Sequence, residues 1–172
     1  LNEILFINRF YFGGNIMGKK IIVAGLGHGG IAAAALISKA GFDVTVYEKE
    51  QEGHLGYDWT DIFAPEALEV AGVGMPPEDK YEYKEDMTFF NPSLNVSLQQ
   101  HVPKEKLEIK MERRDIYAHL INYALECGVK IVYGCEITEP IVLGNRVVGI
   151  KTEQGDFYGD LVIDACGMNS PV

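Results

Sequence analysis

The sequence predicts an α/β fold with a parallel sheet and helical crossovers, and three features predict it. A short apolar run, residues 20–25, is rich in Val and Ile and leads into a glycine-rich loop. An alanine-rich segment, residues 28–40, has the composition of a helix that ends at Gly41. A second β-branched run, residues 43–48, completes a strand–helix–strand unit. Such a unit implies two parallel strands joined by a right-handed crossover.

The composition is that of an ordinary folded domain. Of the 172 residues, 47% are hydrophobic and 23% are charged, which is enough apolar material for one core. The formal net charge of −10 argues against a nucleic acid or an anionic membrane as partner, because both select surfaces rich in Lys and Arg. Residues 21–38 contain no charged side chain and have the length of a membrane helix, but their glycines favour a strand, a loop and a helix. We therefore expect no integral membrane segment.

The cysteines indicate the compartment. Cys127, Cys135 and Cys166 form no C-x-x-C pair and have no His cluster beside them. They therefore match neither a zinc site nor a disulfide framework, and no metal is expected. Free thiols in a reducing cytosol are the expected state, so the sequence favours a cytoplasmic protein.

Two segments differ from the rest in composition. Residues 1–16 are apolar and aromatic-rich, lack the features of a signal peptide and precede Met17, which is typical of a natural start. We expect residues 1–16 to be a poorly ordered extension and residues 17–172 to form the domain. Within it, residues 49–106 carry repeated prolines and acidic clusters. They have too little apolar content to fold alone, so they are expected to be a long excursion from the domain.

The remaining pattern predicts further regular elements. A short helix is expected near residues 65–71, and Gly-containing turns separate the last apolar runs into a predicted β-meander. The expected strands are 87–90, 94–98, 107–111, 130–133, 136–143, 146–152 and 157–165, and a second long helix is expected over 114–127.

The loop after the first strand has the sequence GLGHGG over residues 25–30, which satisfies the pattern G-x-G-x-x-G. The first glycine permits a tight turn, the second lets a pyrophosphate approach the backbone, and the third lets helix and strand pack closely. The helix start offers N–H groups and a positive dipole end to phosphates. Gly25, Gly27, Gly29 and Gly30 are therefore predicted to bind a dinucleotide in a Rossmann-type fold. A glycine-rich turn without a ligand is the alternative.

An acidic residue, Glu48, ends the second predicted strand, about 20 residues beyond this loop. A carboxylate here accepts hydrogen bonds from the 2′- and 3′-hydroxyls of a ribose and repels a 2′-phosphate. The sequence therefore predicts bound FAD or NAD rather than NADP. A solvated strand end is the alternative role of Glu48, and His28, inside the loop, is not expected to be catalytic.

The order of the later elements bears on the choice between FAD and NAD, because an NAD-binding half usually continues with further strand–helix units on the same sheet. Three stretches are informative: residues 46–49 at the second strand end, residues 113–128 with two arginines at a helix start, and residues 160–170 with the pattern D-x-x-x-D-A-x-G-x-x-S. With them, residues 18–172 resemble the flavoprotein superfamily that includes p-hydroxybenzoate hydroxylase, the geranylgeranyl reductases and the flavin-dependent halogenases.

The resemblance implies a Rossmann-type FAD/NAD(P)-binding domain with FAD as its cofactor. It implies an arginine at the flavin nucleotide, Arg114 or, because the register is ambiguous by one residue, Arg113. The other cofactor-binding residues that it adds to Glu48 and the glycines are Lys49, Ile137 through its backbone, Asp164 and Gly167.

The sequence departs from this family at two places. Cys166 stands where the hydroxylases usually carry Asp, which favours the reductase and halogenase branches. Because no resolving cysteine accompanies it, Cys166 is interpreted as a packing residue rather than a redox thiol. The sequence given stops at Val172, where the family continues into a substrate domain and a later Gly-Asp segment, so a chain truncated before the substrate domain is expected.

The expected function is that of the FAD-binding N-terminal portion of an FAD-dependent oxidoreductase, most like the geranylgeranyl reductase branch. In the whole enzyme the flavin is expected to pass hydride or electrons between a nicotinamide or other donor and an organic substrate. The alternatives are a fragment of an NAD-dependent dehydrogenase and a nucleotide-binding module without catalysis. No side chain is assigned a catalytic role, and self-association through exposed core surface is expected.

Overall fold

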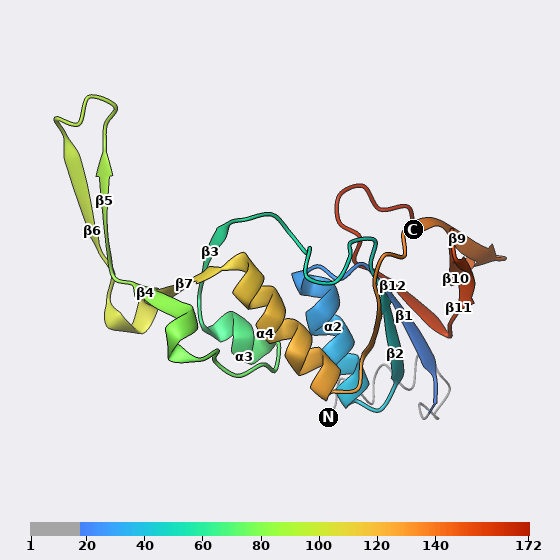
Figure 1. Cartoon of the computed structure of the whole chain (residues 1–172). Coiled ribbons are helices and arrows are strands. Elements are labelled where there is room, and N and C mark those ends of the chain that lie inside the picture. The colour runs from blue at the N-terminus through green and yellow to red at the C-terminus, as the bar shows by residue number, and fades with distance from the viewer. Residues whose placement is uncertain (1–17) are drawn as a thin grey trace. The chain divides into compact units, whose positions relative to one another are not determined.

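The computed structural model describes residues 18–172 (Figure 1), so the expectations for residues 1–16 and for Met17 lie outside the described part. The chain divides into two compact units. The described part of the first unit contains residues 18–56 and 120–172, and the second unit is Tyr57–His119. The second unit holds most of the segment expected to be an excursion.

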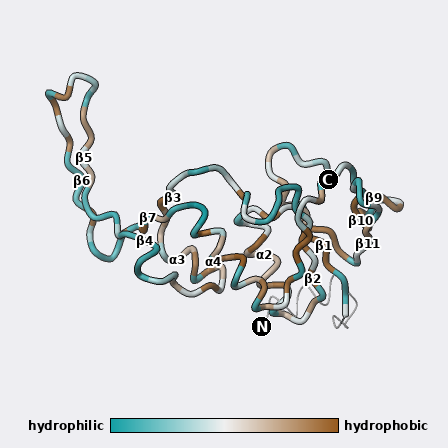
Figure 2. The backbone as a smooth tube through the Cα atoms, viewed as in Figure 1, coloured by the Kyte–Doolittle hydropathy of each residue, from teal (hydrophilic) through white to brown (hydrophobic). Residues whose placement is uncertain are grey.

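A four-stranded parallel sheet forms the centre of the first unit, with the strand order β12-β1-β2-β8. Its central strand β1 is buried on both faces, because every residue after Lys20 in it is buried. Short apolar strands of this kind are typical of parallel sheets, and β1 and β2 are mostly hydrophobic in Figure 2. The predicted α/β fold with a parallel sheet is therefore confirmed. The strands are β1 (Lys20–Ala24), β2 (Asp43–Tyr47), β8 (Lys130–Val132) and β12 (Leu161–Asp164).

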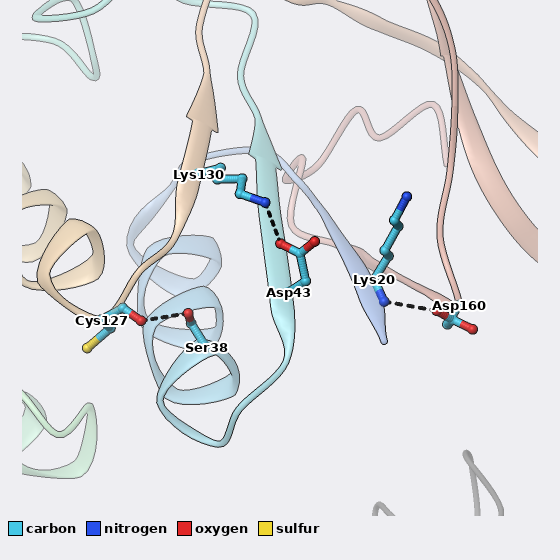
Figure 3. A network of polar contacts seen from close by, with 6 residues as sticks. All are labelled: Lys20, Ser38, Asp43, Cys127, Lys130 and Asp160. Atoms are coloured by element: carbon cyan, nitrogen blue, oxygen red, sulfur yellow. Dashed lines mark hydrogen bonds and ion pairs between the residues drawn. The ribbon is translucent and has the colours of Figure 1, made fainter. Parts of the chain in front are cut away.

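Helical crossovers connect these strands, as predicted. Helix α2 (His28–Lys39) joins β1 to β2 and buries one face, which includes Ile31, Ala34 and Ala35. Helix α4 (Arg113–Glu126) precedes β8. Its end is tied to α2, because the Ser38 hydroxyl donates a hydrogen bond to the carbonyl oxygen of Cys127 at 2.7 Å (Figure 3).

Polar contacts fix the amino ends of the strands (Figure 3). Lys130 at the start of β8 forms an ion pair of 2.7 Å with Asp43 at the start of β2. The N–H of Lys20 at the start of β1 donates to the Asp160 carboxylate at 2.9 Å, and this bond is the main reason why the pKa of Asp160 lies below its ordinary value. The glycine-rich loop lies at the opposite edge of the sheet, where the carboxyl ends of the strands are.

An antiparallel meander packs on the face of the parallel sheet opposite α2 (Figure 1). It consists of β9 (Ile137–Leu143), β10 (Arg146–Thr152) and β11 (Gly155–Tyr158) in the order β11-β10-β9. Ile22 and Ala24 of β1 form a core cluster with residues of the meander such as Ile150.

The prediction of one strand over residues 157–165 is wrong. The run divides at Gly159–Asp160 into β11 of the meander and β12 of the parallel sheet. At Gly159 the chain passes so close to β1 that a Cβ atom would lie 3.1 Å from the carbonyl oxygen of Lys20. Asp160 then pairs with Lys20 through its backbone N–H, at 2.8 Å, and through its carboxylate. These long-range contacts turn the chain from one sheet into the other.

The second unit contains a three-stranded antiparallel sheet, in the order β3-β7-β4, and a separate hairpin of β5 and β6. The predicted helix near 65–71 is present as α3, but β3 and β4 were not predicted. The elements are β3 (Thr60–Phe63), α3 (Glu66–Val70), a 3₁₀ turn (Glu78–Lys80), β4 (Tyr81–Lys84), β5 (Asp86–Phe90), β6 (Ser97–His101), a 3₁₀ turn (Lys104–Lys106) and β7 (Glu108–Glu112).

The strand predicted over residues 94–98 is placed wrongly, because β6 begins only at Ser97. The side chain of Asn91 explains the shift: its Oδ1 accepts hydrogen bonds from the N–H groups of Asn95 and Val96, each at 3.1 Å. Residues 91–96 therefore form a turn, in which Leu94 has a positive φ of 57°.

Among residues 18–172, no helix is long and apolar enough to cross a membrane.

Candidate functional site

Parallel pairing brings three of the predicted site residues to one edge of the sheet. Ala24, the last residue of β1, pairs with Tyr47 on one side and with Asp164 on the other. Gly25 and Glu48 follow directly after β1 and β2. The carboxyl ends of parallel strands point in one direction, and ligands of open α/β sheets bind beyond them. The sequence-predicted Gly25, Glu48 and Asp164 are therefore neighbours.

Two glycines of the loop are required by the packing of the protein itself. Gly25 has a φ of +95°, and a Cβ there would lie 2.6 Å from the carbonyl oxygen of Ala165. A Cβ at Gly30 would overlap the carbonyl oxygen of Gly25 and approach Cβ of Ala165 to 3.1 Å. Gly25 thus makes the turn out of β1, and Gly30 allows α2 to lie against it.

Gly27 and Gly29 are different, because a Cβ at either position would meet no protein atom within 4 Å. The packing of the chain does not explain glycine at these positions. Gly27 immediately precedes α2, at the place where the Rossmann motif brings a pyrophosphate against the backbone. The space beside Gly27 is therefore available to a ligand.

The start of α2 is suited to an anion. Its N-cap residue, Gly27, has no side chain that could cap the helix, and its first turn contains no acidic residue. The first backbone bond of the helix runs from the Ile31 N–H to the Gly27 carbonyl oxygen at 2.9 Å. The first N–H groups of a helix have no partner within the helix, and the helix dipole favours negative charge there.

Glu48 is buried, with 7% of its surface exposed, and no other charged residue in the described part of the chain is buried. Its Oε2 accepts a hydrogen bond from the Leu26 N–H at 2.7 Å, and its Oε1 accepts one from the Glu50 N–H at 2.9 Å. This burial is not that of a solvated strand end. The carboxylate lies beside the glycine-rich loop.

The segment after β12 forms the other side of this edge. Oδ1 of Asp164 accepts a hydrogen bond from the Cys166 N–H at 3.0 Å. Burial acts to raise the pKa of Asp164, but the bonds from Cys166 and Ser170 outweigh it and hold that pKa below its ordinary value. For Cys166, burial first and then the charge of Asp164 raise the pKa of the thiol to about 11. Cys166 packs against the core cluster, in agreement with its interpretation as a packing residue.

The raised pKa gives a testable prediction for thiol reactivity. A thiol with a pKa of about 11 carries little thiolate at neutral pH, so Cys166 should be alkylated slowly. Asp164→Asn removes the negative charge beside the thiol, so the pKa of Cys166 should fall, and alkylation at about pH 8 should become several-fold faster. Burial remains, so the pKa should stay above its ordinary value. Mass spectrometry after iodoacetamide treatment measures the rate, with Cys127 as internal reference, and an unchanged ratio of the two rates would contradict the prediction.

The other predicted site residues are spread over both units. Lys49 and Gly167 are exposed. Ile137 is the first residue of β9, and its side chain is buried in the core cluster. Two residues before it in the sequence, the Cys135 N–H donates to the Glu48 carbonyl oxygen at 2.8 Å. Arg114 is exposed and belongs to the second unit.

Arg113, the alternative to Arg114, is engaged inside the second unit. Its Nε donates to Oδ2 of Asp61 at 2.7 Å, and its Nη2 donates to Oδ1 of Asp61. The guanidinium lies 4.5 Å from the centre of the Tyr57 ring. The bonds to Asp61 raise the pKa of Arg113 above its already high ordinary value. Arg113 therefore stabilises its own unit.

Two contributors were missed in the sequence. Ala165 lies against both Gly25 and Gly30, and the Leu26 N–H is a partner of the Glu48 carboxylate. The small side chain of Ala165 in the Asp-Ala-Cys-Gly segment could have indicated its close contact with the glycines. No local pattern indicates the second. Among residues 18–172, no group of three or more His, Cys, Asp or Glu side chains is arranged to hold a metal ion.

Comparison with known proteins supports the same fold. Residues 23–76 match the family model described as an NAD(P)-binding Rossmann-like domain. A search of curated proteins finds no match.

Similar solved structures include an oxygenase, a protein solved in complex with FAD and a reductase-like protein. The tetrameric form of 2-methyl-3-hydroxypyridine-5-carboxylic acid oxygenase is 21% identical with a TM-score of 0.70, over 84% of this chain and 38% of that chain. CtdE in complex with FAD is 18% identical with a TM-score of 0.71, over 90% of this chain and 40% of that chain. A geranylgeranyl bacteriochlorophyll reductase-like protein from Thermoplasma acidophilum is 18% identical with a TM-score of 0.72, over 92% of this chain and 44% of that chain. This chain thus spans less than half the length of these proteins, and at such identities the likeness shows the fold.

Proposed function

We propose that this chain, which has the Rossmann-type FAD/NAD(P)-binding fold of the flavoprotein superfamily, binds FAD as the N-terminal portion of an FAD-dependent oxidoreductase. One observation carries the proposal: Gly27, beside which a Cβ would meet no other part of the chain, is the N-cap of α2 and follows Leu26, whose N–H is bonded to the buried Glu48 carboxylate. An anion and a sugar diol that are joined to each other, as in the ADP half of FAD, fit this combination.

Each part of the site has a distinct task in this proposal. The pyrophosphate lies against Gly27 and the start of α2, where the helix dipole stabilises its charge. The ribose hydroxyls donate to the Glu48 carboxylate, whose oxygens each keep a free lone pair after accepting one backbone N–H. Lys49, Asp164, Gly167, the backbone of Ile137 and Arg114 complete the proposed cofactor-binding set. The bound flavin supplies the redox chemistry, and the residues of the chain bind and orient it.

FAD is favoured over NAD by the similar structures. CtdE was solved in complex with FAD, and the others are an oxygenase and a reductase-like protein by name. The uncharged Cys166 after Asp164-Ala165 favours the reductase and halogenase branches over the hydroxylases, and within the proposal the geranylgeranyl reductase branch is the finer assignment. A nicotinamide or another donor would reduce the flavin in the whole enzyme. An NAD-dependent dehydrogenase fragment and a non-catalytic nucleotide-binding module are the other candidates.

A titration of the purified chain with FAD, FMN, ADP and NAD tests the proposal, with binding followed by calorimetry and, for the flavins, by absorbance. FAD should bind and ADP should compete with it, because both carry the pyrophosphate and the ribose. FMN should bind weakly, because it lacks the adenosine half. Tight binding of NAD without a response to FAD would instead support the dehydrogenase. Addition of NADH or NADPH to the FAD-bound chain, with bleaching of the flavin as the signal, separates a redox-competent protein from a nucleotide-binding module.

A further inference from the structure

The Glu48 carboxylate joins two loops of the site. Oε2 accepts from the Leu26 N–H in the glycine-rich loop after β1, and Oε1 accepts from the Glu50 N–H in the loop after β2. A buried charge is strongly disfavoured unless hydrogen bonds satisfy it. The carboxylate accepts from a backbone N–H group of each loop, so its burial depends on the position of both.

The residue that Glu48 contacts sits at the start of the loop. The Gly25 N–H donates to the Tyr47 carbonyl oxygen at 2.8 Å, and the next N–H, that of Leu26, donates to Glu48. The Leu26 side chain is fully buried. Two consecutive residues are thus bonded to the end of β2, and the following residue is Gly27, which faces the open space.

We propose that Glu48 is a positioning residue for the glycine-rich loop: its carboxylate holds Leu26, and through it Gly27 and the start of α2, in the phosphate-binding conformation before any nucleotide is present. This inference deepens the proposed function and rests on it. The proposed ribose contact uses the lone pairs that the two N–H groups leave free, so one carboxylate has two tasks. The two tasks are separable by experiment, because a nucleotide without ribose hydroxyls can sense only the first.

Glu48→Gln is the discriminating variant. The amide keeps the size of the side chain and still forms hydrogen bonds with ribose hydroxyls. It has one oxygen and one NH₂ group, so it can accept from only one of the two N–H donors and turns its own donor toward the other. Glu50→Gln is the matched control. It removes the same charge from the exposed side chain of Glu50, two residues beyond Glu48, and leaves the backbone N–H of Glu50 in place.

The experiment measures the affinities of ADP and of 2′,3′-dideoxy-ADP for the wild type and for both variants, with a thermal unfolding curve of each protein. Glu48→Gln should weaken the binding of both nucleotides by about tenfold or more, whereas Glu50→Gln should change neither by more than about twofold. If dideoxy-ADP binds to the folded Glu48→Gln variant as tightly as to the wild type, Glu48 acts on the ribose alone and the inference is overturned.

A second measurement needs no variant and no ligand. In the ligand-free wild type, the backbone amide of Leu26 should be protected from hydrogen exchange by its bond to Glu48. An unprotected Leu26 amide overturns the inference even if Glu48→Gln fails to fold. A wild type that binds neither FAD nor ADP would refute the proposed function instead, while the exchange of Leu26 would still decide whether Glu48 holds the loop.

Discussion

Gly27→Ala should reduce the affinity for FAD by roughly 100-fold, about 3 kcal/mol of binding free energy, without unfolding the protein. The added Cβ meets no protein atom within 4 Å, so the fold has room for it. In the proposed complex that room is taken by the pyrophosphate, whose approach to the backbone a Cβ blocks. Gly27 has φ −67° and ψ 171° at the N-cap of α2, a conformation open to alanine. The loss of glycine at an N-cap lowers the unfolding free energy by about 1 kcal/mol at most.

Calorimetric titration with FAD, together with urea unfolding, checks both halves of this expectation. Gly74→Ala is a suitable control, because a Cβ there also meets nothing within 4 Å and Gly74 belongs to the second unit. It should alter neither stability nor affinity. An unchanged FAD affinity in Gly27→Ala would show that the ligand does not approach the backbone at this residue.

Gly30→Ala should have the opposite profile, with a large loss of stability. Its Cβ would overlap the backbone carbonyl oxygen of Gly25 and approach Cβ of Ala165 to 3.1 Å. Backbone atoms cannot give way by a rotamer change, so α2 must move away from β1. Overpacking of this kind costs about 1–3 kcal/mol and occasionally more, which corresponds to an unfolding temperature lower by roughly 2–4 °C per kcal/mol.

Gly29→Ala provides the matched comparison one residue away. Gly29 is exposed, lies inside α2, and has open space around its Cβ position. Alanine is favoured over glycine within helices by about 0.5–1 kcal/mol, so this variant should be as stable as the wild type or more stable. Urea unfolding should therefore show a loss of stability for Gly30→Ala and none for Gly29→Ala. Equal stability of Gly30→Ala and Gly29→Ala would refute the packing role of Gly30.

The strand–helix–strand unit of the central sheet was predictable because its signals are local. The strand of Ile21–Ala24, the glycine loop and the alanine-rich helix follow one another in the sequence, and each has a composition that favours one conformation. Glu48 was predictable for the same reason, because its distance from the loop is set by one helix and one strand. The arrangement of Gly25 and Gly30 agrees with the roles that the motif assigns to them.

The parts that were missed depend on residues far apart in the chain. β3 and β4 are short and carry polar residues such as Asp61 and Glu82, so their sequence does not resemble a strand. They are strands because both pair with β7. The boundary between β11 and β12 is set by Asp160 contacting Lys20, and no window of sequence contains both residues. The contact between Leu26 and Glu48 likewise depends on how two loops meet in space.

The position of β1 between β2 and β12 has a consequence for synthesis on the ribosome. β2 follows β1 closely in the sequence, but Lys20 and its partner Asp160 are 140 residues apart. While the intervening chain is being translated, one edge of β1 is unpaired, and Gly25 and Gly30 lack Ala165, against which they pack. Contacts between such distant segments form slowly, and unpaired apolar strands favour aggregation. The nascent chain therefore completes the packing of its glycine-rich loop only after residue 165 has left the exit tunnel, and until then one edge of β1 is open to non-native pairing.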